Sequence, residues 1–172
     1  MAILDIVKIP APVLRRKANR ITNFDKDLQI LIDDMVETMR QAPGVGLAAP
    51  QVGVSLRLIV VEYGVENEEG EETGPKKLYP VINPEIVAAS EEKVEGIEGC
   101  LSVPGLIGEV ERHTHIIVKG QNRYGKPVKY KLSGWKARIF QHEIDHLEGV
   151  IFTDLASRVW KPTPEEEANV VD

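Results

Sequence analysis

The stretch "QHEIDHLEG", residues 141–149, decides how the fold is built around its functional residues. In a helix, side chains four residues apart lie one turn apart on the same face, so His142 and His146 can reach one metal ion. Glu143 follows the first histidine and can act as a general base on a water at that ion. The apolar side chains that would anchor the opposite face in the core are Phe140, Ile144 and Leu147. The stretch therefore predicts a helix with an internal, functional polar face.

A third metal ligand is not found downstream of this helix. The longer pattern HExxHxxG is typical of metalloproteases with another histidine three residues after the glycine, but that position is Phe152. A glutamate is the other familiar protease ligand, but we expect the segment around residues 165–167 to be too loose for a preorganised site. Upstream, Cys100 in "EGCLSVPG" is the main candidate, and His113 and His115 are alternatives. A Cys-His-His set with one open position is typical of catalytic metal sites.

Outward from this helix, the hydrophobic pattern predicts an α+β fold. Mostly antiparallel sheets are expected to pack around the central HExxH-bearing helix. A second helix is expected over Asp25–Gln41, capped by Asn23 or Asp25 and ended by Pro43 and Gly44. The other expected elements are a buried strand at Leu56–Glu62, a solvated acidic loop at 64–77, an edge or bulged strand at Leu78–Ala89, a hairpin turning near 123–126, and the HExxH helix at Trp135–Leu147.

Composition limits the class of protein. The chain has 172 residues, a net charge of −6 and one cysteine. This length suits one domain, which we expect at 1–160, followed by a short mobile tail at 161–172. The negative charge argues against a general or sequence-specific nucleic-acid binder, and a lone cysteine excludes an intramolecular disulfide. No apolar run approaches a membrane span and no targeting segment is visible, so a cytoplasmic protein is expected.

A glycine-containing stretch, "GVGLAAPQ" at residues 44–51, carries the pattern GxGxxA. A dinucleotide-binding loop would follow a strand and open a helix, whereas this one follows a helical pattern and Pro50 interrupts any helix after it. We therefore reject the nucleotide interpretation. Gly44 and Gly46 let the chain turn tightly. Gln51 then either offers an amide donor to a site or ties down the backbone of its own loop.

Three stretches in this order, "GVGLAAPQ", "EGCLS" and "QHEIDHLEG", closely resemble the motifs of peptide deformylase. The similarity extends from "MAILDIVKIP" to "IFTDLASR", which is most of the chain. The resemblance implies hydrolytic removal of the N-formyl group from the formylmethionine of nascent polypeptides, with release of formate. It also implies a divalent metal held by Cys100, His142 and His146, with Fe2+ expected in the cell and Zn2+, Ni2+ or Co2+ as substitutes. Cys-His-His ligation itself suits zinc or iron.

The resemblance further implies a role for each residue of the site. Glu143 would be the general acid/base, and the side chain of Gln51 and the backbone N–H of Leu101 would stabilise the oxyanion. The substrate backbone would pair as a strand beside Gly46 and Gly99, a mode that ignores most side chains. The residues expected to line a methionine pocket are Val45, Trp135, Arg138 through its aliphatic stem, and Ile139.

The expected partners are formylmethionyl nascent peptides and the ribosome near its exit tunnel, although the short tail lacks the long terminal helix that some bacterial relatives use there. Three other interpretations stay open. A metallopeptidase lacks its downstream ligand. A non-enzymatic protein with a structural metal site leaves Glu143 and the open coordination position unexplained. A surface helix that carries two histidines by chance is the third.

Overall fold

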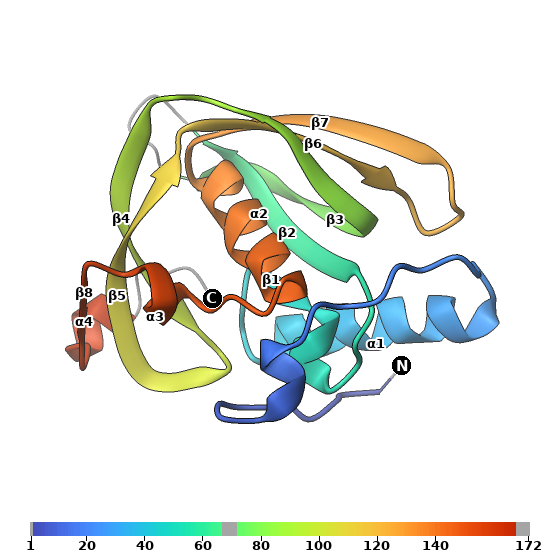
Figure 1. Ribbon diagram of the computed structural model, residues 1–172, viewed down its shortest axis with the longest axis horizontal. Helices are drawn as coiled ribbons and strands as arrows, with labels where there is room; N and C mark the ends of the chain where they lie inside the picture. The colour runs from blue at the N-terminus through green and yellow to red at the C-terminus, as the bar shows by residue number, and fades with distance from the viewer. Residues whose placement is uncertain (1, 67–71, 168–172) are drawn as a thin grey trace.

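In the computed structural model, the chain folds into two antiparallel sheets and two long helices (Figure 1). The structure describes residues 2–66 and 72–167. The five-stranded sheet has the spatial order β1 (Gly46–Ala48), β2 (Leu58–Glu66), β3 (Glu72–Ala89), β6 (His115–Gln121) and β7 (Pro127–Ser133). The three-stranded sheet has the order β4 (Lys93–Cys100), β5 (Val103–His113) and β8 (Arg158–Trp160). The helices are α1 (Lys26–Gln41), α2 (Gly134–Leu147) and the short α3 (Phe152–Leu155) and α4 (Pro164–Glu167). Antiparallel sheets with few helices confirm the α+β expectation.

Strand β2 separates two layers of the core, because successive side chains of a strand point to opposite faces. Ile59 and Val61 join the cluster that contains residues of α2, whereas Leu58 and Val60 join the cluster that contains residues of α1. All four side chains are fully buried. This arrangement explains why the sequence of this strand is continuously apolar rather than alternating.

Helix α2 lies between the two sheets in the middle of the molecule (Figure 1). Phe140, Ile144 and Leu147 are buried in the cluster formed with the five-stranded sheet, which confirms the expected apolar face. The histidines of the polar face are also buried, with exposed fractions of 2% for His142 and 1% for His146. A helix that is buried on both faces must satisfy its polar side chains internally.

The sequence prediction of α1 is confirmed, and Asp25 is its cap. Its side chain accepts a hydrogen bond from the N–H of Leu28 at 3.0 Å. Asn23, the alternative, donates from Nδ2 to the Asp25 carboxylate at 3.0 Å. Gly44 follows the last turn and donates its N–H to the carbonyl of Met39.

Strand β3 departs from its expected position. The edge alternative for Leu78–Ala89 is wrong, because β3 lies in the middle of the five-stranded sheet. Its pairing with β6 begins at Ile82, so Pro80 stands where β2 is the only paired neighbour among the described strands. The register shifts between Ile82 and Glu85, around Pro84, which agrees with the bulge alternative. A proline is thus tolerated inside a central strand where the ladder is incomplete.

The acidic segment at 64–77 is not the solvated loop that its composition predicts. Strands β2 and β3 extend into it, with Val65 opposite Thr73 and Glu66 opposite Glu72. The Glu72 carboxylate on β3 also accepts a hydrogen bond from the N–H of Gly64 on β2 at 2.7 Å, so these strand ends are joined despite their low hydrophobicity. Residues 67–71 of the expected loop lie outside the described residues. Within the expected tail, Glu166 of α4 accepts a hydrogen bond from the indole Nε1 of Trp160. Residues 168–172 lie outside the described residues.

The remaining expected elements are observed. The hairpin of β6 and β7 turns at residues 122–126, where the N–H of Gly125 donates to the carbonyl of Asn122. Within the described ranges, no helix is both long and apolar enough to cross a membrane.

The segment that precedes α1 connects the main parts of the structure by backbone hydrogen bonds. Val7 donates to the carbonyl of Gln51, and Ile9 donates to the carbonyl of Ser102. Further along, Ala18 donates to the carbonyl of Leu147 at the end of α2. The N-terminal segment therefore joins both sheets and the central helix.

The Asp25 cap gives a first prediction. Replacing Asp25 with alanine should lower the free energy of unfolding by about 1 kcal/mol, because one N–H at the start of α1 loses its acceptor. Urea unfolding followed by circular dichroism measures the change. Asp27→Ala is the matched control, since Asp27 lies in the same first turn and is not the cap. Equal losses in both variants would contradict the capping role.

Candidate metal centre

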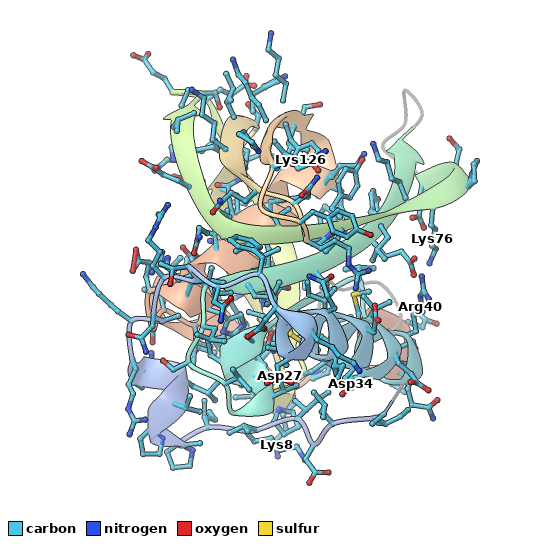
Figure 2. All side chains as sticks on the ribbon, turned by 90° about the vertical axis from the view of Figure 1, so that its right-hand side faces the viewer. Lys8, Asp27, Asp34, Arg40, Lys76 and Lys126 are labelled. Atoms are coloured by element: carbon cyan, nitrogen blue, oxygen red, sulfur yellow. The ribbon has the colours of Figure 1, made fainter. Side chains whose placement is uncertain are left out.

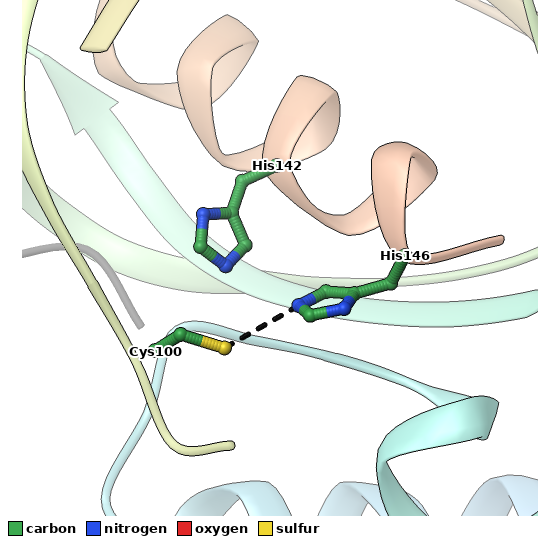
Figure 3. Close-up of side chains that lie close together, drawn as sticks. All are labelled: Cys100, His142 and His146. Atoms are coloured by element: carbon green, nitrogen blue, oxygen red, sulfur yellow. Dashed lines mark hydrogen bonds between the residues drawn. The ribbon is translucent and has the colours of Figure 1, made fainter. Parts of the chain in front are cut away.

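Three buried side chains from two elements meet beside a cleft that one of them, Cys100, lines. Cys100 ends β4, whereas His142 and His146 lie one turn apart on α2 (Figure 3). One ligand atom of each residue lies within 4.8 Å of the other two. Sγ of Cys100 is 3.4 Å from Nε2 of His146. No second cluster of this kind occurs in the part of the chain that the structure describes.

The donor set fits a divalent metal of the zinc or iron type. Sulfur and imidazole ligands at about 2.3 and 2.0 Å from a tetrahedral ion lie about 3.5 Å apart. The distance of 3.4 Å between Cys100 and His146 is close to that separation. Nε2 of His142 is buried and has no hydrogen-bond partner among residues 2–66 and 72–167. Such an atom is costly to bury, and a role as a metal ligand accounts for it.

A buried carboxylate orients the first histidine. Glu98 on β4 is fully buried and lies 2.9 Å from Nδ1 of His142, so an N–H at Nδ1 leaves Nε2 for a metal. Arg112 on β5 donates to both carboxylate oxygens at 2.8 and 2.9 Å. Arg138 on α2 adds a third hydrogen bond at 2.6 Å and also donates to the carbonyls of Val94 and Val110. One carboxylate thus connects β4, β5 and α2 beside the ligands.

Burial and charge act against each other at this centre. Burial alone would raise the pKa of Glu98, but hydrogen bonds from Arg112 and His142 outweigh it and hold the pKa well below its usual value. Burial keeps the pKa of His146 well below its usual value, which favours the neutral form that binds metals. Burial also acts to lower the pKa of His142, but Cys100 and Glu98 raise it well above its usual value. The negative neighbours of His142 therefore favour a positive charge there, which a divalent cation supplies.

The glutamate of the motif packs against the glycine-containing stretch. Glu143 is fully buried on α2, and a Cβ atom placed on Gly46 would lie 2.6 Å from its Oε2. Close approach of the carboxylate therefore requires glycine at this position of β1. The candidate base is held between α2 and β1, next to the first histidine ligand.

Gln51 combines both roles that the sequence left open. It lies in the 3-10 turn Ala49–Val52 after β1 and is 1% exposed. Its Oε1 accepts a hydrogen bond from the N–H of Ala48, which fixes the amide plane. Its Nε2 then donates to Cys100 Sγ at 3.5 Å and to Ser102 Oγ at 3.2 Å. The oxygen ties the loop, and the nitrogen faces the metal centre.

Comparison with known proteins places this arrangement in a family. Residues 3–161 match the family model described as Polypeptide deformylase. The chain belongs to the polypeptide deformylase family. Polypeptide deformylases are metal-dependent enzymes that remove N-formyl groups from nascent peptides. The motif resemblance noted in the sequence is thereby confirmed.

Three deformylases illustrate the similarity. The peptide deformylase of Symbiobacterium thermophilum is 51% identical over all of this chain and 77% of its own length. The crystal structure of the Thermotoga maritima enzyme has a TM-score of 0.82 and 42% identity, covering 92% of this chain and all of the other. The Ehrlichia chaffeensis enzyme in complex with actinonin has a TM-score of 0.83 and 42% identity, covering 92% of this chain and 91% of the other.

The residues of this chain that the sequence predicted to contact substrate fall into two groups. Val45, Gly99 and Leu101 line the cleft together with Cys100. The other group lies outside the described lining of that cleft: Ile139 is fully buried in the core, Trp135 is half-buried against it, and the guanidinium of Arg138 is bound to Glu98.

Several residues that the sequence had offered as ligands lie elsewhere. Nδ1 of His113 is 2.7 Å from the carbonyl oxygen of Ser90, and His115 is exposed. Glu166 accepts hydrogen bonds from Trp160 and Thr163. Phe152, at the position of a metzincin histidine, stacks on the His142 ring with 6.1 Å between centroids.

Sequence reasoning assigned no role to Glu98, Arg112 or Ser102. The signal that could have identified Glu98 is its position inside the motif "EGCLS", one residue before Gly99. Its partner Arg112 lies on the next strand and carries no local sign of its function. Such pairs become visible only when β4 and β5 are placed side by side.

The approach of Gly46 to Glu143 gives a second prediction. Gly46→Ala should displace the Glu143 carboxylate and reduce deformylation on the order of 100-fold, because a shift of about 1 Å in a reacting group has that effect. Metal content should stay at the wild-type value, since the added methyl group faces Glu143 rather than the ligands. Turnover and metal analysis of the same preparation provide the test. Wild-type turnover would show that the carboxylate does not need this space.

The Glu98 network gives a third prediction. Glu98→Gln should weaken zinc binding about 10- to 100-fold, because His142 loses the charged acceptor that orients it. Competition with a chromophoric chelator measures the affinity. Glu62→Gln, which removes a carboxylate from the surface pair with Arg40, is the control and should bind zinc as the wild type does. If Glu98→Gln is poorly folded, Glu98→Asp retains the charge and should bind with intermediate affinity. Unchanged affinity in both Glu98 variants would contradict the orienting role.

Proposed function

We propose that Cys100, His142 and His146 hold the metal with which this deformylase hydrolyses the formamide bond of N-terminal formylmethionine on nascent peptides. The observation that carries the proposal is the convergence of two further groups on this cluster. The amide of Gln51 donates to Cys100, and the charge of Glu143 acts on the neighbouring His142. A candidate metal site, a base and an amide donor in one cluster beside the cleft that Cys100 lines suit hydrolysis of a small amide.

Each group has a chemical task in the proposed reaction. When bound, a divalent metal acidifies a water molecule and polarises the formyl oxygen. Glu143 would accept a proton from the attacking water as the water oxygen adds to the formyl carbon. Gln51 Nε2 and the backbone N–H of Leu101 donate hydrogen bonds to the formyl oxygen as it gains negative charge. Glu143 then returns the proton to the departing amine, which releases formate and a peptide with a free N-terminus.

The cleft supports a mode of substrate binding that depends little on side chains. An extended peptide would pair with the backbone beside Gly46 and Gly99, as an added strand does at a sheet edge. The methionine side chain would enter the cleft beside Val45. Trp135, Arg138 and Ile139, the other residues expected there, lie outside the described lining of the cleft, and the guanidinium of Arg138 is bound to Glu98.

We assign Fe2+ as the metal in the cell, with Zn2+, Ni2+ or Co2+ as substitutes, because a thiolate with two imidazoles suits iron as well as zinc. The proposed partners are formylmethionyl nascent peptides and the ribosome near its exit tunnel. Both place the reaction in the cytoplasm.

A fourth prediction tests this function directly. The metal-loaded protein should release formate from formyl-Met-Ala-Ser and leave Met-Ala-Ser uncleaved. Glu143→Ala should keep its metal and lose turnover by about 100-fold or more, because the proton acceptor is removed. His115→Ala, which changes an exposed histidine outside the site, is the control. Absence of formate would contradict the proposal, and peptide-bond cleavage would favour a metallopeptidase.

A further inference from the structure

The cleft that Cys100 lines has a volume of about 650 Å³, and its described lining residues carry no charged group apart from one lysine. One wall is the turn at Ala42–Val45, and the opposite wall comprises Gly99–Leu101 and Val103–Ile107. The remaining described lining residues are Pro162 and Lys76. Lys76 is therefore the one residue with a charged ammonium or carboxylate among the lining residues that the structure describes. A single cation among otherwise uncharged lining residues gives the cleft a preference for a negative ligand group.

The charge of Lys76 acts on the carboxylate of Glu62, which already has a second basic partner. Arg40 binds Glu62 with hydrogen bonds at 2.6 and 3.0 Å. Hydrogen bonds from Arg40, together with the charges of Arg40 and Lys76, lower the pKa of Glu62. The three side chains thus carry two positive charges and one negative charge. Figure 2 shows Lys76 and Arg40 at the same edge of the molecule, one above the other.

The neighbouring lysine provides a contrast within the same strand. Successive side chains of β3 point to opposite faces. The Nζ of Lys77 lies 5.1 Å from the centroid of the Tyr79 ring, and Lys77 lies outside the described lining of the cleft. Two adjacent lysines with equal charge therefore differ in whether they face the cleft.

We propose that Lys76 is a specificity residue that recognises an acidic side chain of the formylated peptide, downstream of its methionine. This inference rests on the proposed function, because it requires a peptide to leave the metal centre along the cleft. A chain held by its backbone at Gly99 would pass along a cleft whose described lining offers a carboxylate one opposite charge, that of Lys76. Formylated peptides with aspartate or glutamate soon after methionine are then the preferred substrates.

The fifth prediction compares peptides that differ in one charge. C-terminally amidated peptides of the series formyl-Met-Ala-Xaa-Ser and formyl-Met-Ala-Ser-Xaa carry aspartate, asparagine or lysine at Xaa. At low ionic strength, the metal-loaded enzyme should show a kcat/KM that is about two- to fivefold higher for aspartate than for asparagine in at least one series, the range expected for a partly exposed ion pair. The ratio should fall towards one at high salt, since added ions screen the attraction.

Two variants of equal charge separate local recognition from a general field effect. Lys76→Glu should reverse the preference, so that lysine peptides exceed asparagine peptides, whereas Lys77→Glu should keep the aspartate preference. Lys76→Gln should bring the aspartate-to-asparagine ratio to one.

Three results would overturn the inference: a ratio of one in the wild type in both series, an unchanged ratio in Lys76→Gln, or equal effects of Lys76→Glu and Lys77→Glu. The asparagine peptides distinguish this failure from failure of the proposed function. If they are deformylated and the ratio is one, only the role of Lys76 falls. If no peptide releases formate, both proposals fall.

Discussion

The carboxylate of Glu98 is the constraint on which the arrangement of the metal centre depends. It lies on β4, and its partners lie on β5 and α2, so one buried charge joins the small sheet to the central helix. A buried ion pair is weak evidence for stability, because removing its charges from water offsets much of their attraction. Its effect is better understood as selecting one arrangement of the sheet and the helix than as adding stability. With Arg112, Arg138 and His142 all donating to one group, few other positions of α2 relative to β4 satisfy the same atoms.

The source of the third ligand distinguishes this centre from that of a protease with the same helix motif. In a metzincin the third histidine follows the helix, whereas here Cys100 comes from a strand about forty residues earlier in the chain. The position that the third histidine occupies in a metzincin is Phe152 in this chain. The Phe152 side chain is 1% exposed and stacks on the ring of His142. An aromatic ring there excludes water from one side of the ligand. The candidate metal ligands are thus brought together by the packing of the small sheet against α2 rather than by one continuous segment.

Much of the fold and of the site could be predicted from local patterns. The apolar periodicity that predicts α1 and α2 can be recognised within a few consecutive residues. The same holds for the spacing of His142 and His146. The position of β3 could not be predicted, because Pro80 looks like an edge signal unless the extent of β6 is known. The strand ends near Glu66 and Glu72 follow from pairing and not from composition. The roles of Glu98, Arg112 and Ser102 depend on partners that only the folded chain brings together.

The N-terminal segment has a consequence for how the chain folds during its own synthesis. Ala18 pairs with the backbone of Leu147, and Val7 and Ile9 pair with the backbones of Gln51 and Ser102. Residue 18 therefore cannot form its hydrogen bond until residue 147 has left the ribosome. Synthesis of the intervening chain takes roughly ten seconds or more at ordinary translation rates. Contacts between such distant residues also slow folding, because a long loop must close before they form. The proposed metal centre at Cys100, His142 and His146 consequently cannot form before α2 has left the ribosome, so a precursor that still lacks α2 has no assembled centre.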